Sequence, residues 1–351
     1  MFGKLFIVAS ILIVGVATAC DAGASPSPAA SSSEPDFVIT VGHQYSGGRG
    51  SLVTLIDLST GETLAQVTAG DRPWPLFRPS SGELLVSDFG GPDFKPRLRV
   101  FDIQDTSAPK WTMRLPNRAA STLWAPAWAL SADERYLYYA ARPPPDQYPN
   151  WIGIIDLDSG GLIDRARLPL GCGGYKTLTA VDGSKAQVFC SARRFVTVDP
   201  AGAVSDFAPF SWPEEAIASL ARPTATPSPG LSRSPWRPAY PLIRGCTGAG
   251  SRLPCPLSES RRLLSYQPPE GHSLSGLLVY DEEQPADAHL YDLPGGITHL
   301  TPVNATTVAL LNGNSATIYL FDLGTGSIRK ELSAPPGTHW LVGPLLGGER
   351  Q

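Results

Sequence analysis

The chain has 351 residues, 42% of them hydrophobic, and a formal net charge of −4 at pH 7. This is enough for a large core, which a repeat architecture can hold in one domain. No basic run stands out, so nucleic-acid binding has no electrostatic footprint and is set aside. Gly and Pro number 35 each, and the short apolar runs between them are typical of turn-rich all-β proteins.

The first 19 residues have the pattern of an export signal. Lys4 precedes a mostly apolar stretch that ends at Ala19 and is too short to span a bilayer as a helix. The residues before Cys20 read ATA and resemble a bacterial lipobox, although that pattern prefers Leu at Ala17. The resemblance implies cleavage that leaves Cys20 as a lipidated N-terminus. The alternatives are an ordinary secretory signal or an uncleaved anchor.

Residues 20–36 are mostly Ala, Ser and Pro. Such a segment buries too little apolar surface to order itself, so we expect a flexible tether after the lipidated Cys20. Asp21 beside that cysteine resembles the inner-membrane retention signal of bacteria with two membranes. The predicted location is therefore the bacterial plasma membrane, with the protein lipid-anchored on the extracytoplasmic side.

A short phrase then recurs along residues 37–351, in which an apolar run ends in Asp and a turn follows. Residues 55–61 read LIDLSTG, residues 154–160 read IIDLDSG and residues 320–326 read LFDLGTG. The six copies end at Asp57, Asp102, Asp156, Asp199, Asp281 and Asp322, which are separated by 45, 54, 43, 82 and 41 residues. A period in the forties built from strands and turns is the signature of a β-propeller.

Each period is expected to supply four strands. The second unit is the clearest, with predicted strands over residues 74–78, 83–88, 97–103 and 110–115. The folded part begins at residues 37–41, which match a second strand, and residues 340–345 match an inner strand. We therefore predict that the C-terminal strand pairs with the N-terminal blade and closes the ring, which removes exposed sheet edges.

The number of blades depends on the interval between Asp199 and Asp281. Its length of 82 residues has room for an additional blade, and seven blades are predicted. Residues 222–258, however, are rich in Pro and Ser and have few strand signals. The alternative is therefore six blades with a long insertion at about 222–258, which is either a passive loop or an adhesive lid.

The segment over residues 70–82 reads GDRPWPLFRPSSG and resembles the V-G-x-x-P-x-x-V-A-V-S-P-D-G segment of YVTN-type propeller repeats. Residues 129–134, ALSADE, resemble a second copy of its turn. The wider likeness is to the superfamily of quinoprotein amine dehydrogenase heavy chains, which implies a seven-bladed fold. It implies no reaction, because one fold hosts many activities.

Four cysteines remain after Cys20, and an even number in an exported protein suggests two disulfides. Cys172 and Cys190 flank an expected hairpin that would bring them together, and Cys246 and Cys255 would close a small loop. Free thiols are the alternative. Metal binding is less favoured, because the cysteines have no C-x-x-C spacing and no nearby His.

Sequence motifs of catalysis are missing. There is no C-x-x-C-H, G-x-S-x-G, Walker loop or H-E-x-x-H. The recurring Asp residues are interpreted as turn residues that accept hydrogen bonds from the next amides. They also resemble a pyrroloquinoline quinone motif, but Ala65 and Asp164 replace its Trp. No cofactor and no sequence-defined metal site is predicted; a Ca²⁺ ion held in the central channel by one residue from each blade stays open.

One pattern indicates a binding surface. A large or ring-bearing residue occurs near the start of each expected inner strand, and such positions lie near one mouth of a propeller, where loops commonly bind ligands. The candidate residues are Arg72, Trp74, Trp124, Tyr175, Trp212, His299 and Trp340. Packing of these rings between blades is the alternative.

The first functional hypothesis is a monomeric lipoprotein whose propeller binds a protein, peptide or glycan or serves as a scaffold. The second is an enzyme, either a lactonase-like hydrolase with a metal in the tunnel or a redox subunit that resembles an amine dehydrogenase heavy chain. A third is an envelope assembly or sensory component. Whether any catalysis occurs is left open by the sequence.

Overall fold

The structure is a computed structural model. It describes residues 37–43, 50–90, 95–115, 118–119, 128–142, 151–170, 172, 177–180, 183–191, 194–209, 213–214, 217, 242–244, 254–258, 260–267 and 273–344. All of them belong to one compact unit, Pro35–Gln351. Within these residues no helix is long and apolar enough to cross a membrane.

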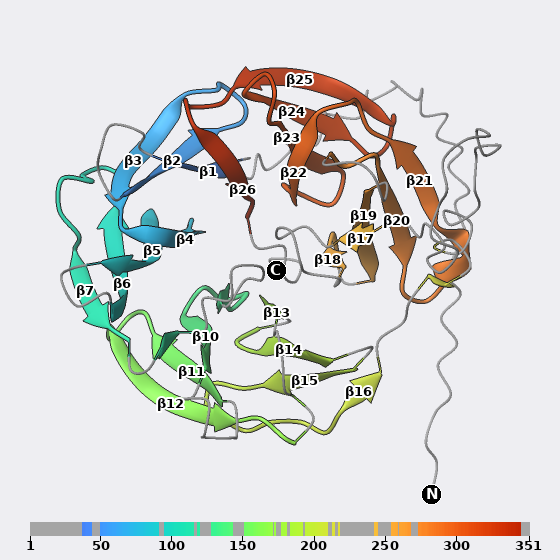
Figure 1. Cartoon of the computed structure of the whole chain (residues 1–351). Coiled ribbons are helices and arrows are strands. Elements are labelled where there is room, and N and C mark those ends of the chain that lie inside the picture. The colour runs from blue at the N-terminus through green and yellow to red at the C-terminus, as the bar shows by residue number, and fades with distance from the viewer. Residues whose placement is uncertain are drawn as a thin grey trace, which may run out of the picture. The chain divides into compact units, whose positions relative to one another are not determined.

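The described residues form six antiparallel sheets arranged in a ring (Figure 1). The strands of the first three sheets are β26 (Thr338–Val342), β1 (Phe37–His43), β2 (Ser51–Asp57) and β3 (Thr63–Ala69); β4 (Asp71–Arg78), β5 (Glu83–Gly90), β6 (Lys95–Asp102) and β7 (Trp111–Arg114); and β8 (Arg118–Ala119), β9 (Trp128–Leu130), β10 (Tyr136–Arg142), β11 (Trp151–Asp156) and β12 (Gly161–Arg167).

The other three sheets follow in chain order around the ring. Their strands are β13 (Thr177–Ala180), β14 (Ala186–Ser191), β15 (Arg194–Val198) and β16 (Ala208–Pro209); β17 (Leu242–Arg244), β18 (Cys255–Pro256), β19 (Arg261–Gln267), β20 (Gly276–Asp281) and β21 (His289–Asp292); and β22 (Ile297–Pro302), β23 (Thr307–Asn312), β24 (Thr317–Asp322) and β25 (Ser327–Ser333). One turn of 3-10 helix, η1 (Pro285–Asp287), lies between β20 and β21.

The fold is a six-bladed β-propeller over the described residues, so the prediction of seven blades is wrong. The long interval between Asp199 and Asp281 supplies one new sheet. Two of its strands, β17 and β18, lie inside the range expected to be an insertion, and both pair with β19. The inner strand of this blade is thus divided into two short pieces, Leu242–Arg244 and Cys255–Pro256. The third blade is divided in the same way, because β8 and β9 pair with different parts of β10.

The ring is closed by the predicted pairing of the two ends of the propeller. β26 runs antiparallel to β1, with Val41 opposite Trp340 and Thr40 opposite Leu341. The last described strand is therefore the inner strand of the first blade, and β1 has a partner on each side. This exchange leaves neither end of the ring as an open sheet edge.

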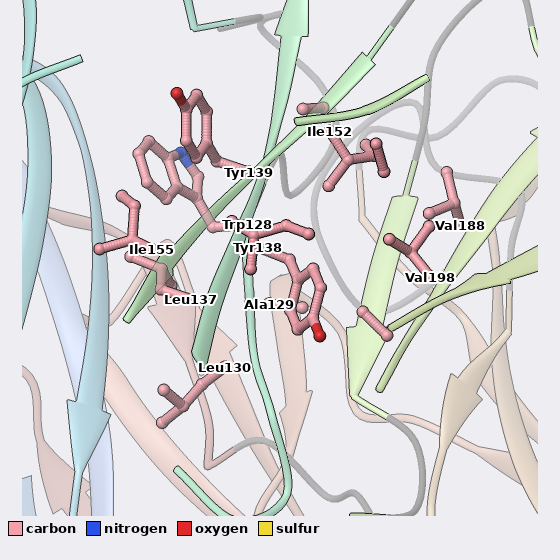
Figure 2. Packing of buried hydrophobic residues seen from close by; sticks show 14 of the residues in the cluster. Trp128, Ala129, Leu130, Leu137, Tyr138, Tyr139, Ile152, Ile155, Val188 and Val198 are labelled. Carbon is pink, nitrogen blue, oxygen red and sulfur yellow. The ribbon is translucent and has the colours of Figure 1, made fainter. Parts of the chain in front are cut away.

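The hydrophobic core lies between neighbouring blades. One cluster joins the second, third and fourth blades, and its aromatic part includes Trp128, Tyr138 and Tyr139 (Figure 2). Separate clusters join the first blade to the second, the sixth to the first, and the fifth to the sixth. Every residue of β23 is buried, whereas residues of the outer strand β25 alternate between exposed and half-buried. Each blade packs against a neighbour on both faces. This explains why the sequences of the inner strands do not alternate between polar and apolar residues.

The recurring Asp residues are turn residues, as predicted. Asp57 Oδ1 accepts from the amides of Ser59 and Thr60 at 2.7 and 3.0 Å, and Asp322 Oδ1 accepts from those of Gly324 and Thr325 at 2.7 and 2.9 Å. The glycine that follows has a positive φ in all three strong copies, with 84° at Gly61, 66° at Gly160 and 66° at Gly326. An L-residue with a side chain rarely adopts this conformation, so the Asp-to-Gly phrase encodes the hairpin.

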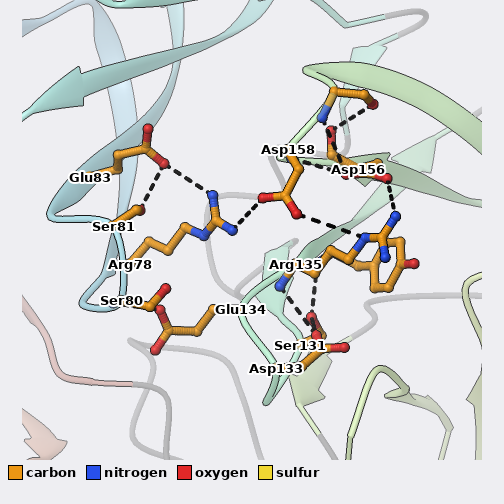
Figure 3. Close-up of polar contacts among 12 residues, drawn as sticks. Arg78, Ser80, Ser81, Glu83, Ser131, Asp133, Glu134, Arg135, Asp156 and Asp158 are labelled. Carbon is orange, nitrogen blue, oxygen red and sulfur yellow. Dashed lines mark hydrogen bonds and ion pairs between the residues drawn. The ribbon is translucent and has the colours of Figure 1, made fainter.

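A polar network joins the second and third blades at the turns (Figure 3). Arg78 at the end of β4 donates to Glu83 Oε2 at 3.2 Å and to Asp158 Oδ1 at 2.7 Å. The carboxylate of Glu83 also binds Lys110 at 2.6 Å. Burial alone would raise the pKa of Glu83, but its hydrogen bonds and charged partners outweigh burial and lower this pKa. Glu134 of the third blade accepts from the amide of Ser80 at 2.9 Å. The network therefore fixes the position of β4, the strand that carries Trp74.

Candidate functional site

Three of the predicted mouth residues come together on three inner strands. Trp74 lies on β4, His299 on β22 and Trp340 on β26. The ring centroids of Trp74 and Trp340 are 4.4 Å apart with an edge-to-face angle of 71°, and those of His299 and Trp340 are 6.0 Å apart at 64°. Trp340 is the middle ring, and the other two flank it from the neighbouring blades. We call these three residues the ring cluster.

The same backbone irregularity precedes each ring. The pairing of β4 with β5 shifts register between Asp71 and Trp74. β22 against β23 shifts between Ile297 and His299, and β26 has one extra residue between Thr338 and Trp340. Each inner strand thus has a β-bulge directly before its ring. Bulges re-aim the side chains that follow them and are common beside functional sites, so the ring cluster is placed by three matching bulges.

The imidazole of His299 is held in one tautomer. Its Nδ1 accepts a hydrogen bond of 3.3 Å from the backbone amide of Leu341, so Nδ1 has a lone pair and the proton of the neutral ring is on Nε2. The side chain is buried, with 7% of the residue exposed. Burial, with a smaller effect from His339, lowers the pKa of His299 to about 3. His299 is therefore a neutral N–H donor at any physiological pH.

The donor atoms of the ring cluster have no acceptor among the residues that the structure describes. Trp74 Nε1, Trp340 Nε1 and His299 Nε2 are all buried, and none makes a hydrogen bond with any residue that the structure describes. The two Trp residues themselves are half-buried. A buried donor without a partner costs about 1–3 kcal/mol, and three such donors within one group of contacting rings are unusual for a purely structural aromatic cluster. The ring cluster is therefore the candidate functional site of the described residues.

The remaining predicted mouth residues are not placed by the structure. The backbone of Arg72 belongs to β4, but its side chain lies outside the described part. Trp124, Tyr175 and Trp212 fall in ranges that are not described. The prediction for these four residues is therefore untested.

The cysteines follow the expected pairing where they are visible. Cys172 and Cys190 form a disulfide beside the β13–β14 hairpin. Cys255 on β18 is also disulfide-bonded, and its predicted partner Cys246 lies outside the described residues, as does Cys20. The first disulfide attaches the segment before β13 to the middle of the fourth blade.

Where the structure describes the chain, no group of three or more His, Cys, Asp or Glu side chains gathers in a metal-binding arrangement. Of the described histidines, His299 accepts a hydrogen bond from a backbone amide and His289 contacts Tyr291. The Ca²⁺ site considered for the central channel stays untested, because part of the chain is not described.

Sequence reasoning missed how the ring cluster is supported. Thr301 Oγ1 accepts from the amide of Gly343 at 2.8 Å, just as His299 accepts from Leu341 two residues earlier. β22 therefore satisfies the amide of Leu341, on the edge of β26 that faces away from β1, and the amide of Gly343 just after this strand. No sequence motif predicts such contacts between a side chain and the backbone, because they depend on the order of strands around the ring.

Comparison with known proteins supports the fold. No protein-family model matches the chain, and no curated protein matches it. Among solved structures, TolB from Acinetobacter baumannii is 13% identical with a TM-score of 0.52, over 86% of this chain and 65% of that one. This chain therefore spans less than two thirds of the length of TolB. At this identity the similarity shows a β-propeller fold alone.

Two further solved structures are more distant. AztD from Citrobacter koseri is 11% identical with a TM-score of 0.45, over 86% of this chain and 82% of that one. A chain of a nidogen/laminin complex is 8% identical with a TM-score of 0.47, over 87% of this chain and 96% of that one. The similarities do not single out the YVTN or amine dehydrogenase families.

Proposed function

We propose that this protein is a binding module, in which a six-bladed propeller uses the ring cluster to bind a protein, peptide or glycan. The observation that carries the proposal is the set of three buried N–H groups on Trp74, His299 and Trp340 that have no acceptor among the described residues. Binding sites of this kind combine apolar rings, which supply contact area, with a few polar groups that fix orientation.

The rigidity of the site favours binding. Each ring follows a bulge on a strand whose neighbours are buried between blades, and β26 is tied to β22 by the His299 and Thr301 contacts. A preorganised site loses little conformational entropy when the ligand arrives. The half-buried faces of Trp74 and Trp340 are suited to stacking on a sugar or on a peptide side chain.

The location is also part of the proposal. The apolar stretch before Cys20 and the Ala, Ser and Pro-rich residues 20–36 support a lipid-anchored protein on the extracytoplasmic side of the bacterial plasma membrane, held off the surface by the tether. We propose that the propeller acts there as a monomer. Mass spectrometry of the membrane-derived protein should find a diacylated or triacylated N-terminal peptide that begins at Cys20, and an unmodified N-terminus elsewhere would contradict the anchor.

A thermal-shift screen tests the binding function. Peptides and oligosaccharides are added to the purified protein, because a ligand that binds the folded form raises the melting temperature. A true ligand should stabilise the wild type and lose its effect in Trp340→Ala. Trp111→Phe is the control, because Trp111 lies on the outer strand β7. Ligands that stabilise the wild type and Trp340→Ala equally would place binding elsewhere.

A further inference from the structure

We infer that the ring cluster is a carboxylate-binding site, which takes the carboxylate of a free organic acid or of a peptide C-terminus. This rests on the proposed binding function and names the ligand group. The inference begins with the hydrogen-bonding character of the three residues. An indole N–H is only a donor, and His299 is restricted to donation at Nε2 because Nδ1 already accepts from Leu341.

The ring cluster is therefore a donor-only site. Its three N–H groups belong to rings whose centroids lie 4.4 and 6.0 Å from the ring of Trp340. A carboxylate is an acceptor-only group with about four lone-pair positions, so it can satisfy several such donors and needs none in return. A sugar hydroxyl brings its own proton, which none of the three N–H groups can accept.

Charge around the site is compatible with an anion. The groups that shift the pKa of His299 are its burial and the imidazole of His339, and no acidic side chain is among them. His339 is exposed beside Trp340 on β26. Phosphate is less well suited, because proteins usually bind its higher charge with Arg or Lys in addition to neutral donors.

Isolated neutral donors hold an anion well when they are fixed before it arrives, since no reorganisation is then needed. The three bulges provide this fixation at the level of the backbone. The edge-to-face contact of Trp74 with Trp340 provides it at the level of the side chains. A carboxylate that accepts two or three N–H bonds is strongly stabilised in its charged form.

The test uses the full-length protein labelled with ¹⁵N-tryptophan, and NMR follows the indole N–H signals. The probes are acetate, tetra-alanine with a free C-terminus, and tetra-alanine amide, each at the same ionic strength. Trp74→Phe and Trp340→Phe assign the signals and remove one donor each while they keep a ring. Trp111→Phe is the matched control on β7.

We expect the Trp74 and Trp340 signals to move downfield with the free acid and to stay unchanged with the amide. Each Trp-to-Phe change should weaken the affinity about tenfold, as expected for a lost hydrogen bond to a charged group, and Trp111→Phe should leave it unchanged. Equal affinity for acetate and the free peptide would identify an organic acid as the ligand class. Binding of the peptide alone would identify a chain terminus.

Three results would overturn the inference. One is an equal response to the acid and the amide, which would keep the binding function but remove the carboxylate. Another is a response of the wild type that Trp74→Phe and Trp340→Phe both retain in full. The third is an absence of any change in the indole N–H signals with all three probes, as expected if these groups contact bound water only. If the variants do not fold, the comparison of acid with amide on the wild type still decides.

Discussion

His299 accepts a hydrogen bond from the backbone amide of Leu341 across the joint between the last blade and the first. Leu341 lies on β26, opposite Thr40 of β1, so this amide is on the edge of β26 that β1 does not cover. The contact has two consequences. It satisfies a buried amide of the closing strand, and it leaves the proton of the neutral imidazole on Nε2. Closure of the ring and the chemistry of the site are thus linked through one side chain.

The first prediction concerns pH and stability. Burial lowers the pKa of His299 to about 3 in the folded protein, from 6.5. The folded form therefore binds fewer protons than the unfolded form between these values. The contribution of His299 is complete above about pH 6.5 and decreases as the pH falls toward 3, by about 1.4 kcal/mol per pH unit. Urea unfolding at pH 7.5, 5.5 and 4.5 measures this loss.

The control for this prediction removes the titrating ring and keeps an acceptor. His299→Gln should show a shallower loss of stability between pH 6.5 and 4.5 than the wild type. Carboxylates that titrate in the same range are common to both proteins and cancel in the comparison. His289→Gln changes an exposed histidine on β21 and should follow the wild type. Parallel curves for the wild type and His299→Gln would contradict the assignment.

The second prediction ranks two ion pairs of the same arginine. Arg78 contacts Glu83 and Asp158, whose side chains are 10% and 59% exposed. Solvent screens the exposed pair, so its coupling energy should be only about 0–1 kcal/mol, whereas the shielded Glu83 pair should exceed it. Double-mutant cycles with Arg78→Met, Glu83→Gln and Asp158→Asn measure both energies. In 1 M NaCl the Asp158 coupling should vanish first. A larger coupling to Asp158 than to Glu83 would refute the ranking.

Much of this fold follows from local sequence. The phrase that ends in Asp and Gly encodes its own hairpin, because Asp57 and Asp322 accept from amides two and three residues later. Ring closure was also predictable, since residues 37–41 and 340–345 match complementary strands. The number of blades was not. The inner strand of the fifth blade consists of only three residues in β17 and two in β18, and such short pieces form through their pairing with β19 and not through their own propensity.

The third prediction concerns Gly153 on β11. A Cβ at this position would collide with the ring of Tyr139, the residue opposite on β10. That ring cannot move easily, because it is buried and stacked on Trp128 with centroids 5.2 Å apart. Gly153→Ala should cost about 1–3 kcal/mol by overpacking. Gly295→Ala is the control, because a Cβ there meets nothing within 4 Å. Chemical denaturation of both variants measures the difference, and equal costs would exclude overpacking as its cause.

The candidate site was only partly predictable. Ring residues near the starts of inner strands pointed to Trp74, His299 and Trp340, and those three do meet. The bulges that aim them have no clear sequence signal, because an extra residue in a strand is defined only against its partner strand. The sequence also could not predict that their N–H groups have no acceptor among the described residues, because this depends on what surrounds each nitrogen in three dimensions.

The last prediction compares two threonines of the sixth blade that differ in one respect. Thr301 Oγ1 accepts from the buried amide of Gly343 at 2.8 Å, whereas Thr307 Oγ1 is buried with no partner in the described part of the chain. Thr301→Val leaves an amide of the closing segment unpaired and should cost about 1–3 kcal/mol. Thr307→Val removes an unpaired hydroxyl and should be neutral or slightly stabilising.

Both variants exchange a hydroxyl for a methyl group of similar shape, so the difference between them isolates the hydrogen bond to the closing strand. Hydrogen exchange should reveal faster opening of β26 in Thr301→Val, with unchanged protection in β10 and β11, because β22 contacts the closing strand at its uncovered edge. Thr307→Val should leave the exchange of β26 unchanged. If the two variants lose equal stability, the Thr301 contact has no special role in closure, and the β1–β26 pairing alone holds the ring.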